Sequence, residues 1–129
     1  MHMQRKLMAW GALLAMLAVG IGAFGAHLLE SRISEDYMKV YETGVQYHLV
    51  HALGVIIIAL VIGQWGESTR LRWAGRLLIA GTVIFSGSLY VLSISGIKVL
   101  GAITPIGGVC FIAGWICLAI EAFSRKTTS

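Results

Sequence analysis

Four long stretches of the chain contain no Asp, Glu, Lys or Arg, and they constrain its fold more than any other feature. They comprise residues 7–26, 45–64, 77–97 and 99–120. Each is about as long as the ~20 residues that an α-helix needs to cross a ~30 Å hydrocarbon layer. A helix also satisfies its own backbone hydrogen bonds within lipid. The sequence therefore predicts four transmembrane helices, over about residues 6–27, 45–64, 74–95 and 103–122.

Composition supports the same fold class. Only 12% of the 129 residues are charged, about half the share in an ordinary soluble domain. We expect a single all-α membrane domain over residues 1–129, an antiparallel bundle of four helices. The first apolar run is longer than the core of a usual signal peptide, so we expect it to be retained as the first span.

The basic residues predict an orientation. Seven lie on the side of the two termini and the second connection, namely Arg5, Lys6, Arg70, Arg72, Arg76, Arg125 and Lys126. Three lie on the other side, namely Arg32, Lys39 and Lys98. Because Lys and Arg concentrate in cytoplasmic loops, this distribution predicts that both termini are cytoplasmic.

Two connections on the outer side show further patterns. In the first, Tyr37, Tyr41 and Val45 recur at helical spacing behind a possible cap at Ser34. This predicts a short amphipathic helix at the outer interface, running into the second span. In the third, Thr104 before Pro105 predicts the N-cap and first residue of the last helix. Whether residues 99–103 are helical or form a re-entrant stretch stays open at this point.

Small residues recur along the spans and predict close helix packing. The candidate packing residues are Ala18, Gly22, Ala26, Gly87, Gly107 and Gly108. Small side chains at such positions let membrane helices approach closely. A dimer face or a narrow passage is the alternative function for the same residues.

Polar groups inside the spans point to function, because they are costly in lipid. The spans hold no Asp, Glu, Lys or Arg near mid-membrane, which argues against a transporter built on a central carboxylate. His48 and His51 lie three residues apart, a spacing that puts them on one face of a helix. The candidate polar site comprises His27, Gln46, His48, His51, Ser86, Ser88, Tyr90 and Thr104.

Three hypotheses fit these polar residues. The first is hydrogen bonding between helices, the second is metal or haem ligation, and the third is a small-molecule, lipid or proton site. No acidic or thiolate ligand accompanies the histidines, so we expect neither a metal site nor a cofactor. Cys110 and Cys117 are ~10 Å apart along one helix, beyond disulfide reach. No phosphate loop, nucleophile elbow or zinc-protease motif is present in the sequence, so we expect no enzymatic activity.

Four segments in order resemble one family. They are Gly22-Ala23-Phe24-Gly25-Ala26-His27, the run from Thr43 to Leu53, Ser86-Gly87-Ser88-Leu89-Tyr90, and the run from Gly101 to Gly108. Together they resemble the signature of domain-of-unknown-function family 423, the small bacterial membrane proteins of the YgdD and YwdK type, which are similar to a eukaryotic transmembrane family. The resemblance spans nearly the whole chain. It implies a four-helix protein of the bacterial cytoplasmic membrane and no known activity.

These observations lead to one main functional hypothesis. We expect a non-enzymatic bundle that acts through membrane lipid or protein partners in membrane maintenance. The partners expected are lipid, with a membrane protein or a second copy of the chain as further possibilities, and no nucleic acid. The alternatives are a small transporter or channel that uses the outer histidines, and a haem- or metal-binding membrane protein.

Overall fold

A computed structural model describes residues 2–125, and these residues form helices joined by short connections. The first rod comprises α1 (His2–Val19), the π-helical turn η1 (Gly20–Gly25) and α2 (Ala26–Leu29). The second is α3 (Glu35–Trp65). The third comprises α4 (Thr69–Gly81), the π-helical turn η2 (Thr82–Ser86) and α5 (Gly87–Ser95). The fourth comprises the 3₁₀ turn η3 (Lys98–Ala102) and α6 (Thr104–Ser124).

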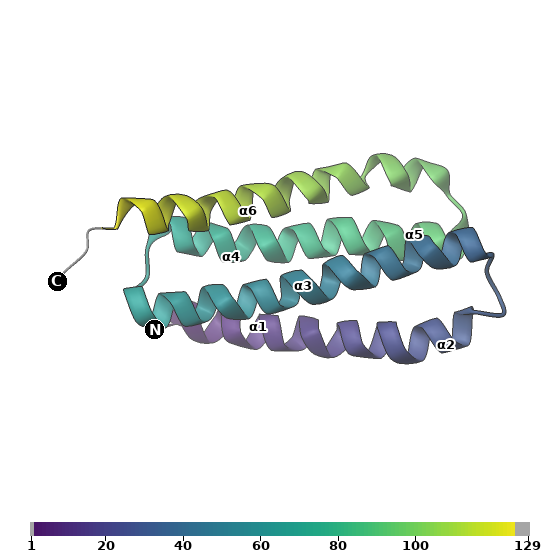
Figure 1. The fold of residues 1–129 in the computed structure, drawn as a ribbon, viewed down its shortest axis with the longest axis horizontal. Coiled ribbons are helices and arrows are strands. Elements are labelled where there is room, and N and C mark those ends of the chain that lie inside the picture. Colours follow the sequence, from purple (N-terminus) through teal and green to yellow (C-terminus); the bar gives the residue numbers. More distant parts are fainter. Residues whose placement is uncertain (1, 126–129) are drawn as a thin grey trace.

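All four rods are long and apolar enough to cross a membrane. Each predicted span lies inside one of them, and the rods extend beyond the predicted limits at most ends. Successive rods run antiparallel, with α3 and the α4–α5 rod in the middle and with α1 and α6 on opposite sides (Figure 1). The all-α, four-helix fold class predicted from the sequence is confirmed.

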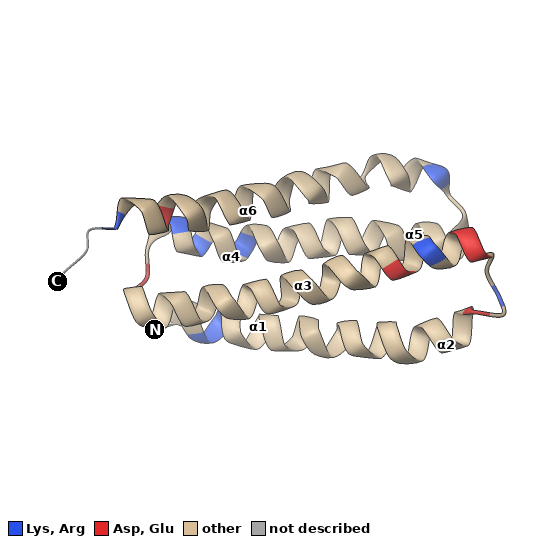
Figure 2. Cartoon of the chain, in the orientation of Figure 1, with Lys and Arg blue, Asp and Glu red and all other residues tan. Residues whose placement is uncertain are grey.

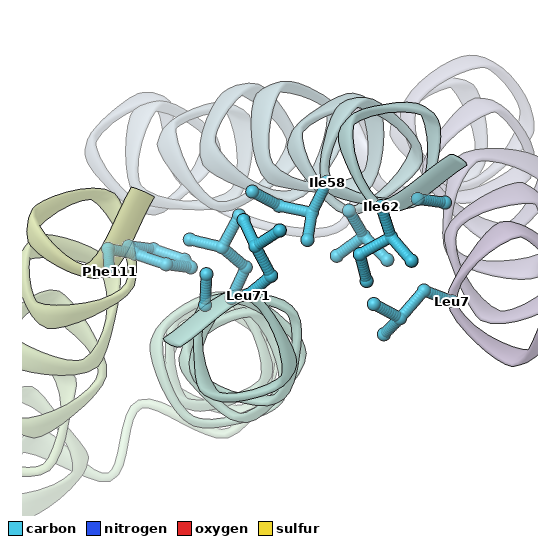
Figure 3. Close-up of a cluster of buried hydrophobic side chains, with 9 residues drawn as sticks. Leu7, Ile58, Ile62, Leu71 and Phe111 are labelled. Atoms are coloured by element: carbon cyan, nitrogen blue, oxygen red, sulfur yellow. The ribbon is translucent and has the colours of Figure 1, made fainter. Parts of the chain in front are cut away.

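The hydrophobic core joins all four rods. Its buried members are Leu7, Val55, Ile58, Ala59, Ile62, Leu71, Ala74, Leu78 and Phe111 (Figure 3). The packing is close where glycines lie at the contacts: a Cβ added at Gly75 of α4 would overlap the side chain of Leu7 on α1. The apolar core therefore holds the four rods together at the level of Leu7 and Leu71.

Charged residues lie toward the two ends of the bundle, and the long middle of each rod carries none among residues 2–125 (Figure 2). We call the end that holds Arg5 and Arg125 the terminal end. We call the end that holds the connections at residues 30–34 and 96–97 the distal end. Lys126, one of the basic residues counted in the sequence, lies outside the described residues.

A buried acid ties helices together at the terminal end. Glu121 of α6 is 9% exposed, and its carboxylate lies 3.6 Å from Arg70 of α4 and 3.9 Å from Arg125. Arg125 also covers the ring of Trp65 and donates to its carbonyl at 3.3 Å. This contact joins the end of α3 to α4 and α6.

Of the two local predictions for the outer connections, the first is confirmed and the second is wrong by one residue. Residues 35–44 are helical, and Ser34 accepts a hydrogen bond from the Tyr37 amide at 3.2 Å. The segment runs into the second span as predicted, as part of the 31-residue α3 and not as a separate short helix. Thr104 is the first residue of α6 and not its N-cap, since its hydroxyl is used across helices. Residues 99–102 belong to the 3₁₀ turn η3.

Candidate functional site

Most of the polar residues singled out in the sequence lie between the distal end and the middle of the bundle. His48 on α3 is 4% exposed, and its Nδ1 lies 2.8 Å from the Tyr90 hydroxyl on α5. The backbone of Leu14 on α1 is a neighbour of the same ring. The Nε2 atom of His48 is buried and has no hydrogen-bond partner among the described residues. His48 thus joins α3 to α5 through one ring nitrogen.

His51, one turn further along α3, faces a different helix. The Nε1–H of Trp115 on α6 donates to His51 Nε2 at 3.0 Å, and His51 Nδ1 lies 2.8 Å from the carbonyl of Tyr47. An indole only donates and a carbonyl only accepts, so the ring must carry its proton on Nδ1 and none on Nε2. The geometry therefore fixes a neutral ring in a single tautomer, with both nitrogens bonded.

Aromatic rings surround His51. Its ring stacks on Phe111 with 3.5 Å between centroids. The ring of Tyr47 is stacked with Phe111 at 6.2 Å and tilted against Phe85 at 4.5 Å. Tyr47 comes from α3, Phe85 from η2, and Phe111 from α6. Side chains of α3 and α6 therefore meet each other and Phe85, which comes from the rod between these two helices.

The hydroxyl residues are used in packing. Ser86 Oγ donates to the carbonyl of Gly44 at 2.7 Å, which links η2 to α3. Ser88 and Thr104 hydroxyls lie 2.6 Å apart and link α5 to α6. Because each bond spans two helices, these residues act as the inter-helix hydrogen bonds that one of the three hypotheses described.

His27 and Gln46 do not join these contacts. Both side chains are exposed, and neither has a hydrogen-bond partner among residues 2–125. The structure therefore does not gather the eight candidate residues into one site. It places His48 with Tyr90, His51 with Trp115, Ser86 with Gly44 and Ser88 with Thr104, while His27 stands apart on α2.

The predicted packing residues differ in their surroundings. Ala18 is 1% exposed, and a Cβ at Gly22 would lie 2.8 Å from Val45 Cγ1. Ala26 lines a groove of about 270 Å³ beside Tyr41. Gly107 lies directly on the backbone of Phe85, whereas Gly108 makes an ordinary contact with that side chain and Gly87 faces open space.

Sequence reasoning missed Tyr41 as a site residue. Its hydroxyl donates to the carbonyl of Ile21 at 2.6 Å, inside the π-helical turn η1. Its ring lies 5.4 Å from that of Tyr90. The predicted amphipathic pattern did mark Tyr41 as apolar-facing, but nothing in that pattern indicated a bond to a backbone carbonyl. Trp115, Phe111 and Glu121 were missed for the same reason, since their partners lie on other helices.

This contact gives a testable prediction for Gly25 in η1. A Cβ there would overlap the hydroxyl oxygen of Tyr41. We expect Gly25→Ala to lower the free energy of unfolding by about 1–2 kcal/mol. In a Tyr41→Phe background the same change should cost little, because the next nearest atom, Tyr41 Cζ, is 3.5 Å away. Thermal unfolding of the two single variants and the double variant in detergent measures this, and additive costs would contradict it.

No group of three or more His, Cys, Asp and Glu side chains with a metal-binding arrangement occurs within residues 2–125. Cys110 and Cys117 are both free thiols. His51 has no ring nitrogen left for a metal, since both are hydrogen-bonded. The haem or metal hypothesis therefore gains no support from the geometry of these side chains.

A groove opens on the side of α3 next to the His51 cluster. It has a volume of about 430 Å³ and is lined by Gln46, Tyr47, Leu49, Val50 and His51. Its lining is mainly apolar, and Gln46, Tyr47 and His51 are its polar residues. The side chains of Gln46 and Tyr47 are exposed. The groove therefore combines an apolar wall with side chains that can form hydrogen bonds.

These features define a class of protein, an integral membrane protein built from four apolar helices. Residues 21–108 match the family model described as "Protein of unknown function (DUF423)". A UPF0382 membrane protein of Staphylococcus haemolyticus is 54% identical over 113 residues, covering 88% of this chain and 91% of the relative. The UPF0382 membrane protein YwdK of Bacillus subtilis is 52% identical over 112 residues, covering 87% and 91%.

The chain therefore belongs to the DUF423 family. The matched range contains the four segments on which the sequence resemblance was based, so that prediction is confirmed. No solved structure matches the chain.

Proposed function

We propose that this protein is a non-enzymatic component of the bacterial cytoplasmic membrane that binds a membrane lipid in the lateral groove beside His51. The observation that carries this proposal is the groove of about 430 Å³ lined by residues 46, 47 and 49–51. A lipid-binding bundle of this kind would serve membrane maintenance by holding or sensing a lipid, without changing it chemically.

The level of the groove along α3 favours an amphiphile. Glu42 is the last charged residue before the uncharged part of α3. At ~1.5 Å per residue, Gln46 lies ~6 Å and His51 ~14 Å further along the helix. The groove would thus run from the headgroup level, where Gln46 and Tyr47 offer hydrogen bonds, into the acyl region beside Val50.

The buried polar side chains already form hydrogen bonds within the protein, which makes a transporter or channel the weaker alternative. A transporter or channel needs polar side chains that are free to bind the solute. His51 has both nitrogens bonded, and Ser86 and Ser88 bond to other helices. The exposed groove is the place where unused polar groups face outward.

The charge distribution supports an orientation for this proposal. Among the described residues, six basic side chains lie at the terminal end, namely Arg5, Lys6, Arg70, Arg72, Arg76 and Arg125. Three lie at the distal end, namely Arg32, Lys39 and Lys98. By the positive-inside rule both termini are cytoplasmic, and the groove takes its lipid from the opposite leaflet.

Photo-crosslinking tests the proposal. The protein is reconstituted in vesicles containing phosphatidylethanolamine with a diazirine on its acyl chain, and labelled residues are mapped by mass spectrometry. We expect residues 46–51 to be labelled several-fold more than residues 57–60. Leu60 is the matched reference, because it lies on the same helix and is as exposed as Val50, at 56%.

A pair of variants completes this experiment. Val50→Phe should fill the groove and lower the labelling of residues 46–51, whereas Leu60→Phe should leave that labelling unchanged. Equal labelling along α3 in the wild-type protein would mean that only bulk lipid touches this surface, and would overturn the proposal.

A further inference from the structure

A second groove lies on α1 at the terminal end of the bundle. It has a volume of about 460 Å³ and is lined by Gln4, Arg5, Met8, Ala9 and Ala12. Gln4 packs against α3, since a Cβ added at Gly63 would overlap its side-chain amide. The small side chains of Ala9 and Ala12 leave the space open. Gln4 and Arg5 are the polar residues of the lining, and the other three residues are apolar.

The two cations beside this groove differ from most other cations at the terminal end because they are not paired with an acidic side chain in the described part of the chain. Arg70 and Arg125 lie close to Glu121, and Arg72 lies 3.5 Å from Glu67. Arg5 and Lys6 have no acidic partner among residues 2–125, and both are exposed. Their charge is therefore available to a ligand.

The position of Arg5 matches the boundary of the membrane. Arg5 and Lys6 directly precede the uncharged run that starts at Leu7. Met8, Ala9 and Ala12 then lie ~5–10 Å deeper along the helix axis. A guanidinium offers paired N–H donors that match phosphate oxygens, and basic residues at this level attract anionic lipid.

We propose that this groove binds an anionic phospholipid, with its phosphate on Arg5 and one acyl chain along Met8, Ala9 and Ala12. Lys6 adds attraction for the headgroup. The site lies at the opposite end of the bundle from the groove beside His51, and it does not depend on the function proposed for that groove. It gives the terminal end of the protein a preference for anionic over zwitterionic lipid.

Native mass spectrometry of the full-length protein in mild detergent tests this site. The probes are 1-palmitoyl-2-oleoyl phosphatidylglycerol and the phosphatidylcholine with the same acyl chains. We expect the first phosphatidylglycerol molecule to bind more tightly than phosphatidylcholine. Arg5→Gln should raise the dissociation constant for phosphatidylglycerol about fivefold, the loss expected for one basic residue near a membrane surface.

The matched charge control is Arg76→Gln. Arg76 lies at the same end and packs on the ring of Trp73, with no acidic partner among the described residues, but it does not line the groove. We expect this variant to retain the wild-type dissociation constant. Equal weakening by Arg5→Gln and Arg76→Gln would mean diffuse attraction by net charge and would overturn the site.

A steric pair tests the acyl part of the groove without changing charge. Ala12→Phe should fill the space and weaken phosphatidylglycerol binding, whereas Leu13→Phe should not, because Leu13 is exposed but lies outside the groove. Unchanged binding by a folded Ala12→Phe variant, or equal affinity of the wild-type protein for both lipids, would also overturn the proposal. The thermal unfolding temperature of each variant confirms that it is folded.

Discussion

Replacement of Gly107 by alanine is expected to lower the free energy of unfolding by about 3 kcal/mol, the upper part of the usual range for overpacking. The added Cβ would lie 2.7 Å from Phe85 Cβ and 2.8 Å from Phe85 Cα, and it would overlap the Phe85 amide nitrogen. Backbone atoms cannot rotate away as the end of a flexible side chain can. Helix α6 would therefore have to move away from η2, which also loosens the Ser88–Thr104 bond.

Gly87 provides the matched control for this experiment. It was predicted from the sequence as a packing residue alongside Gly107, yet a Cβ there would meet no atom within 4 Å. Gly87→Ala should be neutral or stabilise by up to about 1 kcal/mol, because alanine is the better helix former. Chemical unfolding followed by circular dichroism in detergent measures both variants. Similar stability of the two variants would contradict the packing of α6 on η2.

The membrane spans could be predicted because the relevant signal is local. An uncharged run of about 20 residues has few stable arrangements in a bilayer other than a helix. The charges at residues 35–42 marked this part of α3 as a short helix leading into the second span, outside the predicted limits of that span. In the structure these residues extend the span toward the distal end, and the buried side of Tyr41 packs against the first rod.

The contacts of the polar site could not be predicted, because they depend on how each helix is rotated against its neighbours. His48 and His51 are three residues apart, which places them ~60° apart around the helix. That difference is enough to direct His48 to Tyr90 on α5 and His51 to Trp115 on α6. Sequence spacing showed that both lie on one face of a helix, but not that they have different partners.

The two π-helical turns could not be predicted from the sequence either. They occupy residues 20–25 and 82–86, and each overlaps a segment on which the family resemblance was based. Each turn meets a polar contact with α3: Tyr41 bonds to the Ile21 carbonyl in η1, and Ser86 in η2 bonds to the Gly44 carbonyl. Turns of this kind often occur at functional positions. Here they place hydrogen-bonding groups where α3 can reach them.

His51→Ala is expected to lower the free energy of unfolding by about 3 kcal/mol, for two reasons that add together. The substitution removes the ring that stacks on Phe111, with 3.5 Å between centroids. It also leaves the indole N–H of Trp115 without its acceptor at His51 Nε2. Unfolding in detergent measures the loss, and a cost below about 1 kcal/mol would contradict the central role of this ring.

A double-mutant cycle then isolates the hydrogen bond from the stacking. His51→Phe keeps an aromatic ring of similar shape, and Trp115→Phe removes only the indole donor and part of the ring. Each single variant leaves one partner unpaired, whereas the double variant leaves neither, so the two costs should not add. We expect a coupling energy of about 1 kcal/mol, within the range for polar contacts between membrane helices. A coupling energy of zero would show that the bond between α3 and α6 contributes nothing to holding the bundle together.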